Sequence, residues 1–206
     1  MKNIKILLLI IPFSLYACSA STQPKSTKEN DLSKITNPEF KKYASSFSET
    51  ALPFLFADTL TQVIPENVVK KYIDPEYDLA SVMGTNEYYY GWRIFYSNFV
   101  VLLYGYHYEP GVMGVINHFV YAETYTYDGK KIESTEVLDN WNMRQGGELV
   151  YRESNFSITK EFLVEIKATE TTETLADEEG GDFETTQVHS ERKIKLHETG
   201  KFEILK

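Results

Sequence analysis

The 206-residue chain has little cysteine, an excess of acidic over basic residues and no apolar run of transmembrane length. Its one cysteine, Cys18, leaves no pair for an internal disulfide, so the fold must rely on packing alone. The chain contains 21 Lys and Arg residues against 30 Asp and Glu residues, which gives a net charge of −9. This balance argues against a broad electrostatic grip on nucleic acid or on anionic headgroups, and we expect no nucleic-acid partner.

The local signatures of catalysis and metal binding are also missing. The sequence has no G-x-S-x-G elbow and no P-loop, and its histidines form neither an HExxH motif nor a close pair. These histidines are His107, His118, His189 and His197. We therefore predict no catalytic residue, no metal ligand and no cofactor from local motifs, although catalytic carboxylates that are distant in sequence stay open as an alternative.

One acidic segment, Asp177 to Asp182, carries hard oxygen ligands that suit calcium. It lacks the alternating ligands and the terminal bidentate Glu of an EF-hand loop. The simpler interpretation is a solvated loop between two strands, in which Gly180 and Gly181 allow the chain to reverse.

The first seventeen residues have the layout of a secretory signal. Lys2 and Lys5 form a positive n-region, and an apolar run from Ile6 ends at the small residue Ala17. The run is too short for a transmembrane helix, which needs roughly 17–25 apolar residues. Pro12 would also break hydrogen bonds that a helix in lipid has to keep.

The sequence Leu15-Tyr16-Ala17-Cys18 resembles the lipobox of bacterial lipoproteins. The resemblance implies cleavage after Ala17, a diacylglyceryl group on the Cys18 thiol and attachment to a membrane of the cell envelope. Ser19 is not the Asp that retains such proteins at the inner membrane of enteric bacteria, so an outer-membrane location is favoured in a Gram-negative host. The alternative is an ordinary secreted protein with an incidental cysteine.

Behind the signal, residues 18–35 are expected to form a lipidated N-terminus and a flexible tether, because Ser19 to Lys34 is rich in Ser, Thr and Lys and has no aromatic residue. Residues 36–206 are long enough for one domain with a real core. Loss of Lys2 and Lys5 with the signal takes the net charge to −11. We expect this acidic domain to be a monomer.

Two short helices are predicted at the start of the domain. Asn37-Pro38-Glu39 offers an N-cap, a proline at the first helical position and an acid in the first turn, which predicts a helix over 38–46. Pro65-Glu66 opens a second helix that has to stop before Pro75, because a residue that precedes proline avoids the helical region.

From Asn86 onward the pattern is typical of β-strands, so the fold class is mostly β: an antiparallel meander that forms a sandwich or an incompletely closed barrel. Asp128-Gly129 predicts a type I′ hairpin turn, and 140–147 is expected to be a polar loop. The expected strands are 88–96, 99–108, 116–127, 131–138, 149–158, 162–173, 183–197 and 201–205.

Aromatic residues recur at every second position in two neighbouring strands, so each set is expected to share one face. Exposed tyrosines give rigid contact area with a hydroxyl at the tip, which suits a partner protein or a sugar ring. Packing between neighbouring strands explains the same pattern without a ligand. The predicted ligand-binding residues are Tyr88, Tyr90 and Trp92 in one strand and Tyr104, Tyr106 and Tyr108 in the next.

Three functions follow as hypotheses. The leading one is a membrane-anchored, non-enzymatic envelope lipoprotein that binds a protein or a glycan through an aromatic β-face. The second is a glycosidase-like envelope hydrolase, which would need two carboxylates about 5–10 Å apart in a cleft. The third is a structural or assembly accessory. In all three, the N-terminal lipid is the expected contact with the membrane.

Overall fold

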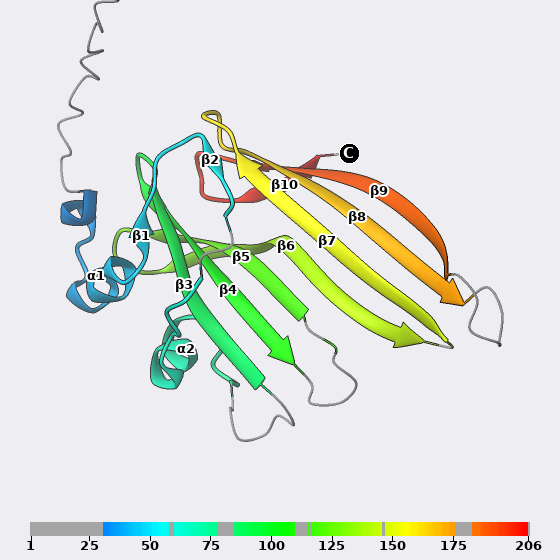
Figure 1. Ribbon diagram of the computed structural model, residues 1–206. Helices are drawn as coiled ribbons and strands as arrows, with labels where there is room; N and C mark the ends of the chain where they lie inside the picture. The colour runs from blue at the N-terminus through cyan, green and yellow to red at the C-terminus, as the bar shows by residue number, and fades with distance from the viewer. Residues whose placement is uncertain are drawn as a thin grey trace, which may run out of the picture.

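The computed structural model describes residues 31–57, 60–77, 85–109, 115, 117–145, 147–175 and 183–205. Within these ranges the chain forms ten strands in one mixed sheet, together with two short α-helices that precede most of the sheet (Figure 1). The prediction of a mostly β fold is therefore confirmed. The described strands do not close into a barrel.

The elements follow the chain in a simple order. A 3₁₀ turn, η1, covers Asp31–Lys34, and the two helices are α1 (Pro38–Ser45) and α2 (Glu66–Tyr72). The strands are β1 (Ser48–Glu49), β2 (Phe54–Leu55), β3 (Thr85–Phe95), β4 (Phe99–Glu109), β5 (Asn117–Thr126), β6 (Lys131–Gln145), β7 (Glu148–Ile158), β8 (Leu163–Leu175), β9 (Phe183–Leu196) and β10 (Phe202–Leu205). The 3₁₀ turn η1 thus lies inside the range that the sequence predicted to be a tether.

Strands β3 to β10 form an antiparallel meander in which each strand pairs with the next one in sequence. The two shortest strands lie outside this order. Strand β1 pairs in parallel with β3, and β2 pairs with the end of β7 at Phe54↔Ile158. Figure 1 shows β3, β4 and β5 side by side in green, and β7, β8 and β9 side by side from yellow to orange.

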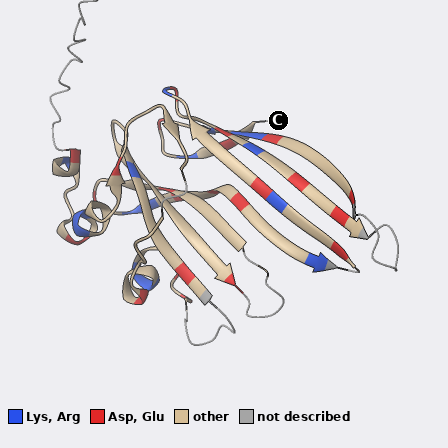
Figure 2. Cartoon of the chain, in the orientation of Figure 1, with Lys and Arg blue, Asp and Glu red and all other residues tan. Residues whose placement is uncertain are grey.

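Strand β4 is the centre of the molecule because both of its faces are buried. Phe99, Val101 and Leu103 pack into a core that also takes side chains from β5 to β9. The alternate residues, Val100 and Leu102, pack into a second core beneath the helices. Charge is correspondingly scarce here, since Glu109 is the one charged residue of β4 (Figure 2). Five consecutive apolar residues, from Phe99 to Leu103, are typical of a strand that is buried on both faces.

Helix α1 is capped as its sequence predicts. The Asn37 side chain accepts hydrogen bonds from the backbone N–H groups of Glu39 and Phe40, and Phe40 is buried in the second core. At the other end, the Arg93 guanidinium reaches back from β3 to the carbonyl groups of Ala44 and Ser45. These contacts satisfy carbonyls that a helix C-terminus leaves without intrahelical partners, and they attach α1 to the sheet.

Two local predictions were wrong. Residues 140–145 were expected to lie in a polar loop, but they continue β6 as far as Gln145 because β7 supplies a pairing partner there. The turn at Asp128-Gly129 is also not of type I′, which needs positive φ at two central residues. Gly129 has φ +90°, whereas Phe162 is the one non-glycine residue with positive φ in the described part of the chain. A type I turn closed by a left-handed glycine fits this geometry.

In the described part of the chain, no helix is long and apolar enough to span a membrane. The predicted signal, the lipobox with Cys18 and the acidic segment 177–182 lie outside the described residues.

Candidate ligand-binding cavity

The sheet forks where β6 leaves β5 and joins β7. Trp141 marks this point, because it pairs with Asn117 of β5 on one side and with Arg152 of β7 on the other. Beyond Trp141, β6 pairs only with β7, up to Gln145↔Glu148. Before it, β6 pairs with β5 while β7 turns toward β2. The fork therefore opens between two strands that are consecutive in the chain.

Where the backbones of β6 and β7 separate, side chains form hydrogen bonds with backbone groups that have no partner on the neighbouring strand. The N–H of Ser154 donates to Asn140 Oδ1 at 2.5 Å, and Ser154 Oγ donates to the same oxygen at 2.9 Å. Ser154 Oγ in turn accepts a hydrogen bond of 3.0 Å from the N–H of Asp139. Backbone groups that lose their ladder partner are thereby satisfied, which holds the fork in one geometry.

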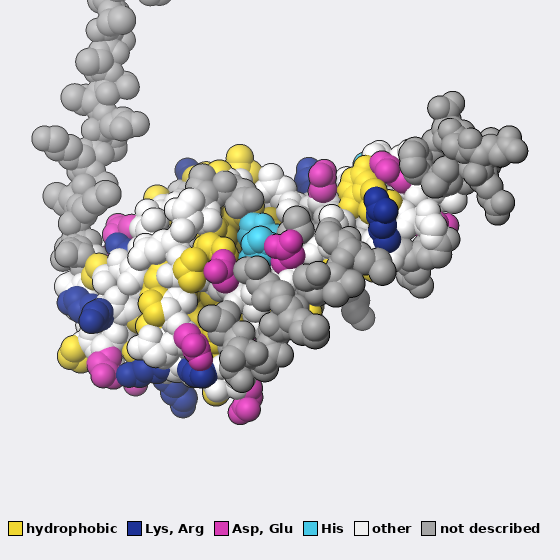
Figure 3. All heavy atoms as spheres, turned by 60° about the horizontal axis from the view of Figure 1, so that its bottom comes forward, with side chains coloured by type: hydrophobic (Ala, Val, Ile, Leu, Met, Phe, Trp, Pro, Cys, Tyr) yellow, Lys and Arg dark blue, Asp and Glu magenta, His cyan; other side chains and the backbone are white. Residues whose placement is uncertain are grey.

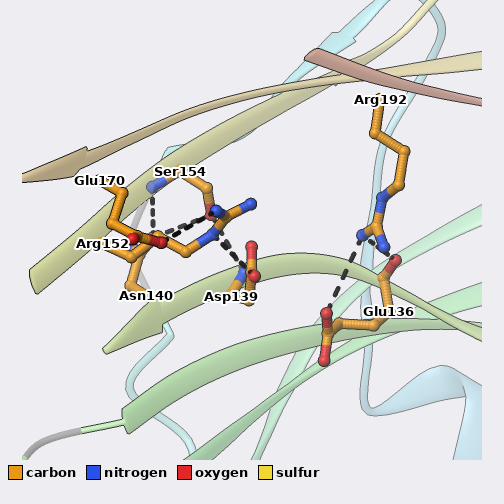
Figure 4. Close-up of polar contacts among 7 residues, drawn as sticks. All are labelled: Glu136, Asp139, Asn140, Arg152, Ser154, Glu170 and Arg192. Atoms are coloured by element: carbon orange, nitrogen blue, oxygen red, sulfur yellow. Dashed lines mark hydrogen bonds and ion pairs between the residues drawn. The ribbon is translucent and has the colours of Figure 1, made fainter. Parts of the chain in front are cut away.

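An arginine crosses the fork on the side of β7 (Figure 4). Arg152 Nε lies 2.8 Å from Asp139 Oδ2 on β6, and Arg152 Nη1 lies 3.8 Å from Glu170 Oε2 on β8. All three side chains are partly shielded from solvent; those of Arg152 and Asp139 are 23% and 21% exposed. The guanidinium therefore links three neighbouring strands at the point where the sheet divides.

A second arginine makes a similar contact with the part of β6 that precedes Asp139. Arg192 of β9 donates a hydrogen bond of 2.9 Å to the backbone carbonyl of Glu136, and its Nη2 lies 3.9 Å from the Glu136 carboxylate (Figure 4). Burial raises the pKa of Glu136, and the charge of Asp139 raises it further, while Arg192 and Arg152 oppose the shift. Glu136 and Asp139, the two acids of this part of β6, thus each contact an arginine from another strand.

A cavity of about 320 Å³ opens at the fork, within the range of small-ligand sites. Its walls combine aromatic rings, carboxamides and a few charges. The lining residues are His118 of β5, Asn140, Trp141 and Asn142 of β6, and Leu149, Tyr151, Arg152 and Glu153 of β7.

The described lining combines an aromatic surface with amide groups. Tyr151 supplies a flat apolar surface, and Asn140 and Asn142, on the same face of the β6–β7 pair, supply amide donors and acceptors. Trp141 lies opposite Arg152 and belongs to the other face. Glu153 is the one carboxylate in the described lining, so no pair of acids of the glycosidase kind lines this cavity. Among the residues that the structure describes, no group of His, Cys, Asp and Glu side chains is placed to hold a metal ion.

The aromatic residues predicted from sequence lie elsewhere. Tyr104 is buried, with 4% of its surface exposed, and donates a hydrogen bond to Glu123. Tyr88 and Tyr106 are half-buried, and their ring centroids are 4.7 Å apart, while Tyr108 stacks beside Tyr106. At the margin where β4 ends and β3 and β5 begin, hydrophobic side chains reach the surface beside a histidine and acidic side chains (Figure 3). The structure thus brings part of the predicted aromatic set together, in an arrangement that is mostly packing.

Trp92 does not share a face with Tyr88 and Tyr90, as the alternation predicted. The β3–β4 register shifts between Tyr90 and Trp92, so an extra residue, Gly91, reverses the alternation. Trp92 therefore packs against Phe54 in the first core, whereas Tyr90 packs against the core beneath the helices.

Tyr90 does reach a second, smaller cavity of about 290 Å³, between α1 and α2. Tyr43 and Tyr72 line it as well, and these two rings stack on each other at 4.2 Å with an angle of 5° between their planes. Lys71 at the rim is paired with Glu39 at 2.7 Å. The two helices on either side of this cavity are already held together by aromatic packing.

Sequence reasoning missed the larger cavity in part because it assigned the three lining residues of β6, Asn140, Trp141 and Asn142, to a loop. The alternation of Trp141 and Met143 with Asn140, Asn142 and Arg144 was the available signal for a strand. Tyr151 lies in a strand that was predicted correctly, but its position opposite Asn142 depends on the β6–β7 register, which a sequence pattern does not give.

Comparison of the chain with models of known protein families, with curated proteins and with solved structures finds no match. The protein is therefore described by its own fold, as a mostly β domain with a forked, mixed sheet.

Proposed function

We propose that this protein is a lipid-anchored lipoprotein of the bacterial envelope and that its β domain binds a glycan, without cleaving it, in the cavity between β5, β6 and β7. The observation that carries the binding function is the presence of Tyr151 in one open cavity with the side chains of Asn140 and Asn142, which the β6–β7 register puts on the same face. The lipobox-like sequence before Cys18 supports the anchor.

A glycan fits this combination of side chains. Sugar rings present apolar C–H faces that pack on aromatic rings, and hydroxyl groups that exchange hydrogen bonds with amides and charged groups. The cavity supplies both, and Arg152 and Glu153 add one charge of each sign. The lining is fixed before any ligand arrives, because Arg152 and Asn140 are held by Asp139 and Ser154. A preformed site loses less conformational entropy when it binds.

The hydrolase alternative has less support. Glu136 and Asp139 are neighbouring acids near the fork, but each lies beside an arginine and neither lines the cavity. Glu153, the one carboxylate in the described lining, is exposed to solvent. A general acid in a glycosidase needs a partner carboxylate across the scissile bond.

The anchor can be tested with Cys18→Ser in the native host. We expect the variant to lose incorporation of labelled fatty acid and to accumulate as an unprocessed precursor, because the thiol is the acceptor of the lipid. Gel mobility and metabolic labelling would measure both effects. Processing at Ala17 together with continued labelling would contradict the lipoprotein assignment.

The cavity can be tested with Tyr151→Ala in a screen against envelope polysaccharide fragments. We expect a loss of affinity of at least about tenfold, because an aromatic platform at the centre of a site contributes more than about 1 kcal/mol. Titration calorimetry on the wild-type and variant proteins would give the two dissociation constants. Asn142→Ala should weaken the same ligand.

Met143→Ala is the matched control. Met143 lies two residues beyond Trp141 on β6, is 39% exposed and does not line the cavity. Its truncation should leave the affinity unchanged. Equal losses in Met143→Ala and Tyr151→Ala would mean that the β6–β7 pair acts through stability rather than through contact with a sugar, and the absence of binding to any fragment would reject the glycan proposal.

A further inference from the structure

Strand β9 presents a long backbone edge that no described residue covers. One side of β9 pairs with β8 along its whole length, from Leu163↔Lys195 to Leu175↔Phe183. On the other side, β10 pairs only with Lys193 to Leu196. Residues 184–191 of β9 are all exposed. Figure 1 shows this part of β9 at the outer margin of the sheet, beyond the reach of β10.

Two other margins of the sheet, those of β3 and β6, are protected. The margin of β3 is covered by β1 and by the segment around Ile64, whose N–H donates to the carbonyl of Tyr88 at 2.7 Å. The margin of β6 before the fork receives the Arg192 side chain at the carbonyl of Glu136. Natural sheets usually manage edges in this way, because uncovered N–H and C=O groups invite another strand.

The uncovered part of β9 has few of the features that usually prevent an edge strand from pairing with another chain. Residues 184–191 contain no proline and no lysine, and the β8–β9 register runs through them without a bulge. Val188, at the middle of this stretch, is 65% exposed although it is apolar. A straight, uncovered strand with an exposed apolar residue at its centre is suited to receive a second strand.

We propose that the β9 edge pairs with the β9 edge of a second copy of this chain, antiparallel and about a two-fold axis at Val188. The sequence is self-complementary in this register. Val188 lies opposite its own copy, and on the same face Glu184 lies opposite Arg192 of the second copy, twice over. A shift by one residue in one direction would instead set Glu184 against Glu191, with like charges facing each other.

The proposed contact would make the protein a dimer, whereas its composition alone predicts a monomer. It is isologous, as a two-fold interface must be, and it joins the two sheets into one. A single strand pair buries little surface, so we expect a weak dimer that forms at high local concentration. The contact uses none of the residues that line the cavity, and both cavities stay available in the dimer.

The test uses the chain from Cys18 onward with Cys18→Ser, so that a cysteine introduced later is the only one. Val188→Cys should form a disulfide-linked dimer under mild oxidation, because the two copies of residue 188 face each other directly. Gln187→Cys, which lies opposite His189 of the second copy in this register, should cross-link several times more slowly. Leu55→Cys, on β2 and 70% exposed, controls for random collision.

Sedimentation equilibrium gives an independent measurement. The parent chain should show a concentration-dependent dimer, Val188→Lys should shift it to monomer by placing two like charges at the axis, and Leu55→Lys should leave it unchanged. The proposal is overturned by a parent chain that stays monomeric at all concentrations. Equal cross-linking of the cysteines at positions 188 and 55 also overturns it.

Discussion

Replacing Lys131 by methionine is expected to lower the free energy of unfolding by about 2–3 kcal/mol, an unusually large effect for a side chain that is 39% exposed. The reason is the buried residue that Lys131 contacts. Lys131 is ion-paired with Glu123, whose exposure is 1%. Removing the cation leaves a carboxylate buried without a compensating charge, which costs about 3–5 kcal/mol for fully buried pairs and less where water reaches one partner.

The surroundings of Glu123 cannot replace the lost charge. Tyr104 donates a hydrogen bond of 3.1 Å to one carboxylate oxygen, and Tyr125 donates one of 2.5 Å to the other. Burial of the two hydroxyls raises the pKa values of both tyrosines far above the ordinary range, and the charge of Glu123 adds to the shift, so they stay neutral. Lys131 is therefore the one cation that the structure places in contact with Glu123.

Two variants separate charge from packing in this network. Lys130→Met removes the neighbouring exposed lysine and should change stability by no more than about 0.5 kcal/mol. The double variant Lys131→Met/Glu123→Gln should recover most of the loss, because a neutral amide needs no counter-charge. Urea denaturation would measure all three variants. A double variant no more stable than Lys131→Met alone would mean that the aliphatic part of Lys131, rather than its charge, stabilises the fold.

Gly91→Ala is expected to cost about 3 kcal/mol, at the upper end of the range for overpacked sites. Gly91 is the extra residue at the β3–β4 register shift. A Cβ there would lie 2.3 Å from the backbone oxygen of Leu103, so β3 and β4 would have to move apart. Loss of stability should be accompanied by a change in the near-UV circular dichroism of Trp92, which packs just beyond the bulge.

Gly105→Ala is the comparison for this prediction. Its Cβ would meet a side-chain atom of Leu60 at 2.3 Å, the far end of a side chain that can rotate away. We expect a cost of about 1 kcal/mol. The two variants add the same methyl group to adjacent strands, so equal losses of stability would show that the backbone contact at Leu103 does not set the cost at position 91.

The local elements of this protein are largely encoded in its sequence. Asn37-Pro38-Glu39 predicted the start of α1, and the exclusion of helix before Pro75 predicted the end of α2 within a residue or two. Alternation, β-branched residues and turn residues located the eight strands from β3 to β10 and their order as a meander. These signals are short-range, since they depend on capping groups, on φ preferences and on periods of two or 3.6 residues.

The sequence by itself therefore determined the strand content, the two helices and the burial of β4 on both faces, because Phe99 to Leu103 is apolar at consecutive positions. Only the tertiary structure decided which residues meet. The bulge at Gly91 moved Trp92 to the other face of the sheet, and the register between β6 and β7 placed Tyr151 beside Asn142 in one cavity. Burial of Glu123 with Lys131 and the open margin of β9 follow in the same way from pairing between strands. A shift of one residue in register reverses every side chain that follows it, and no local pattern fixes that shift.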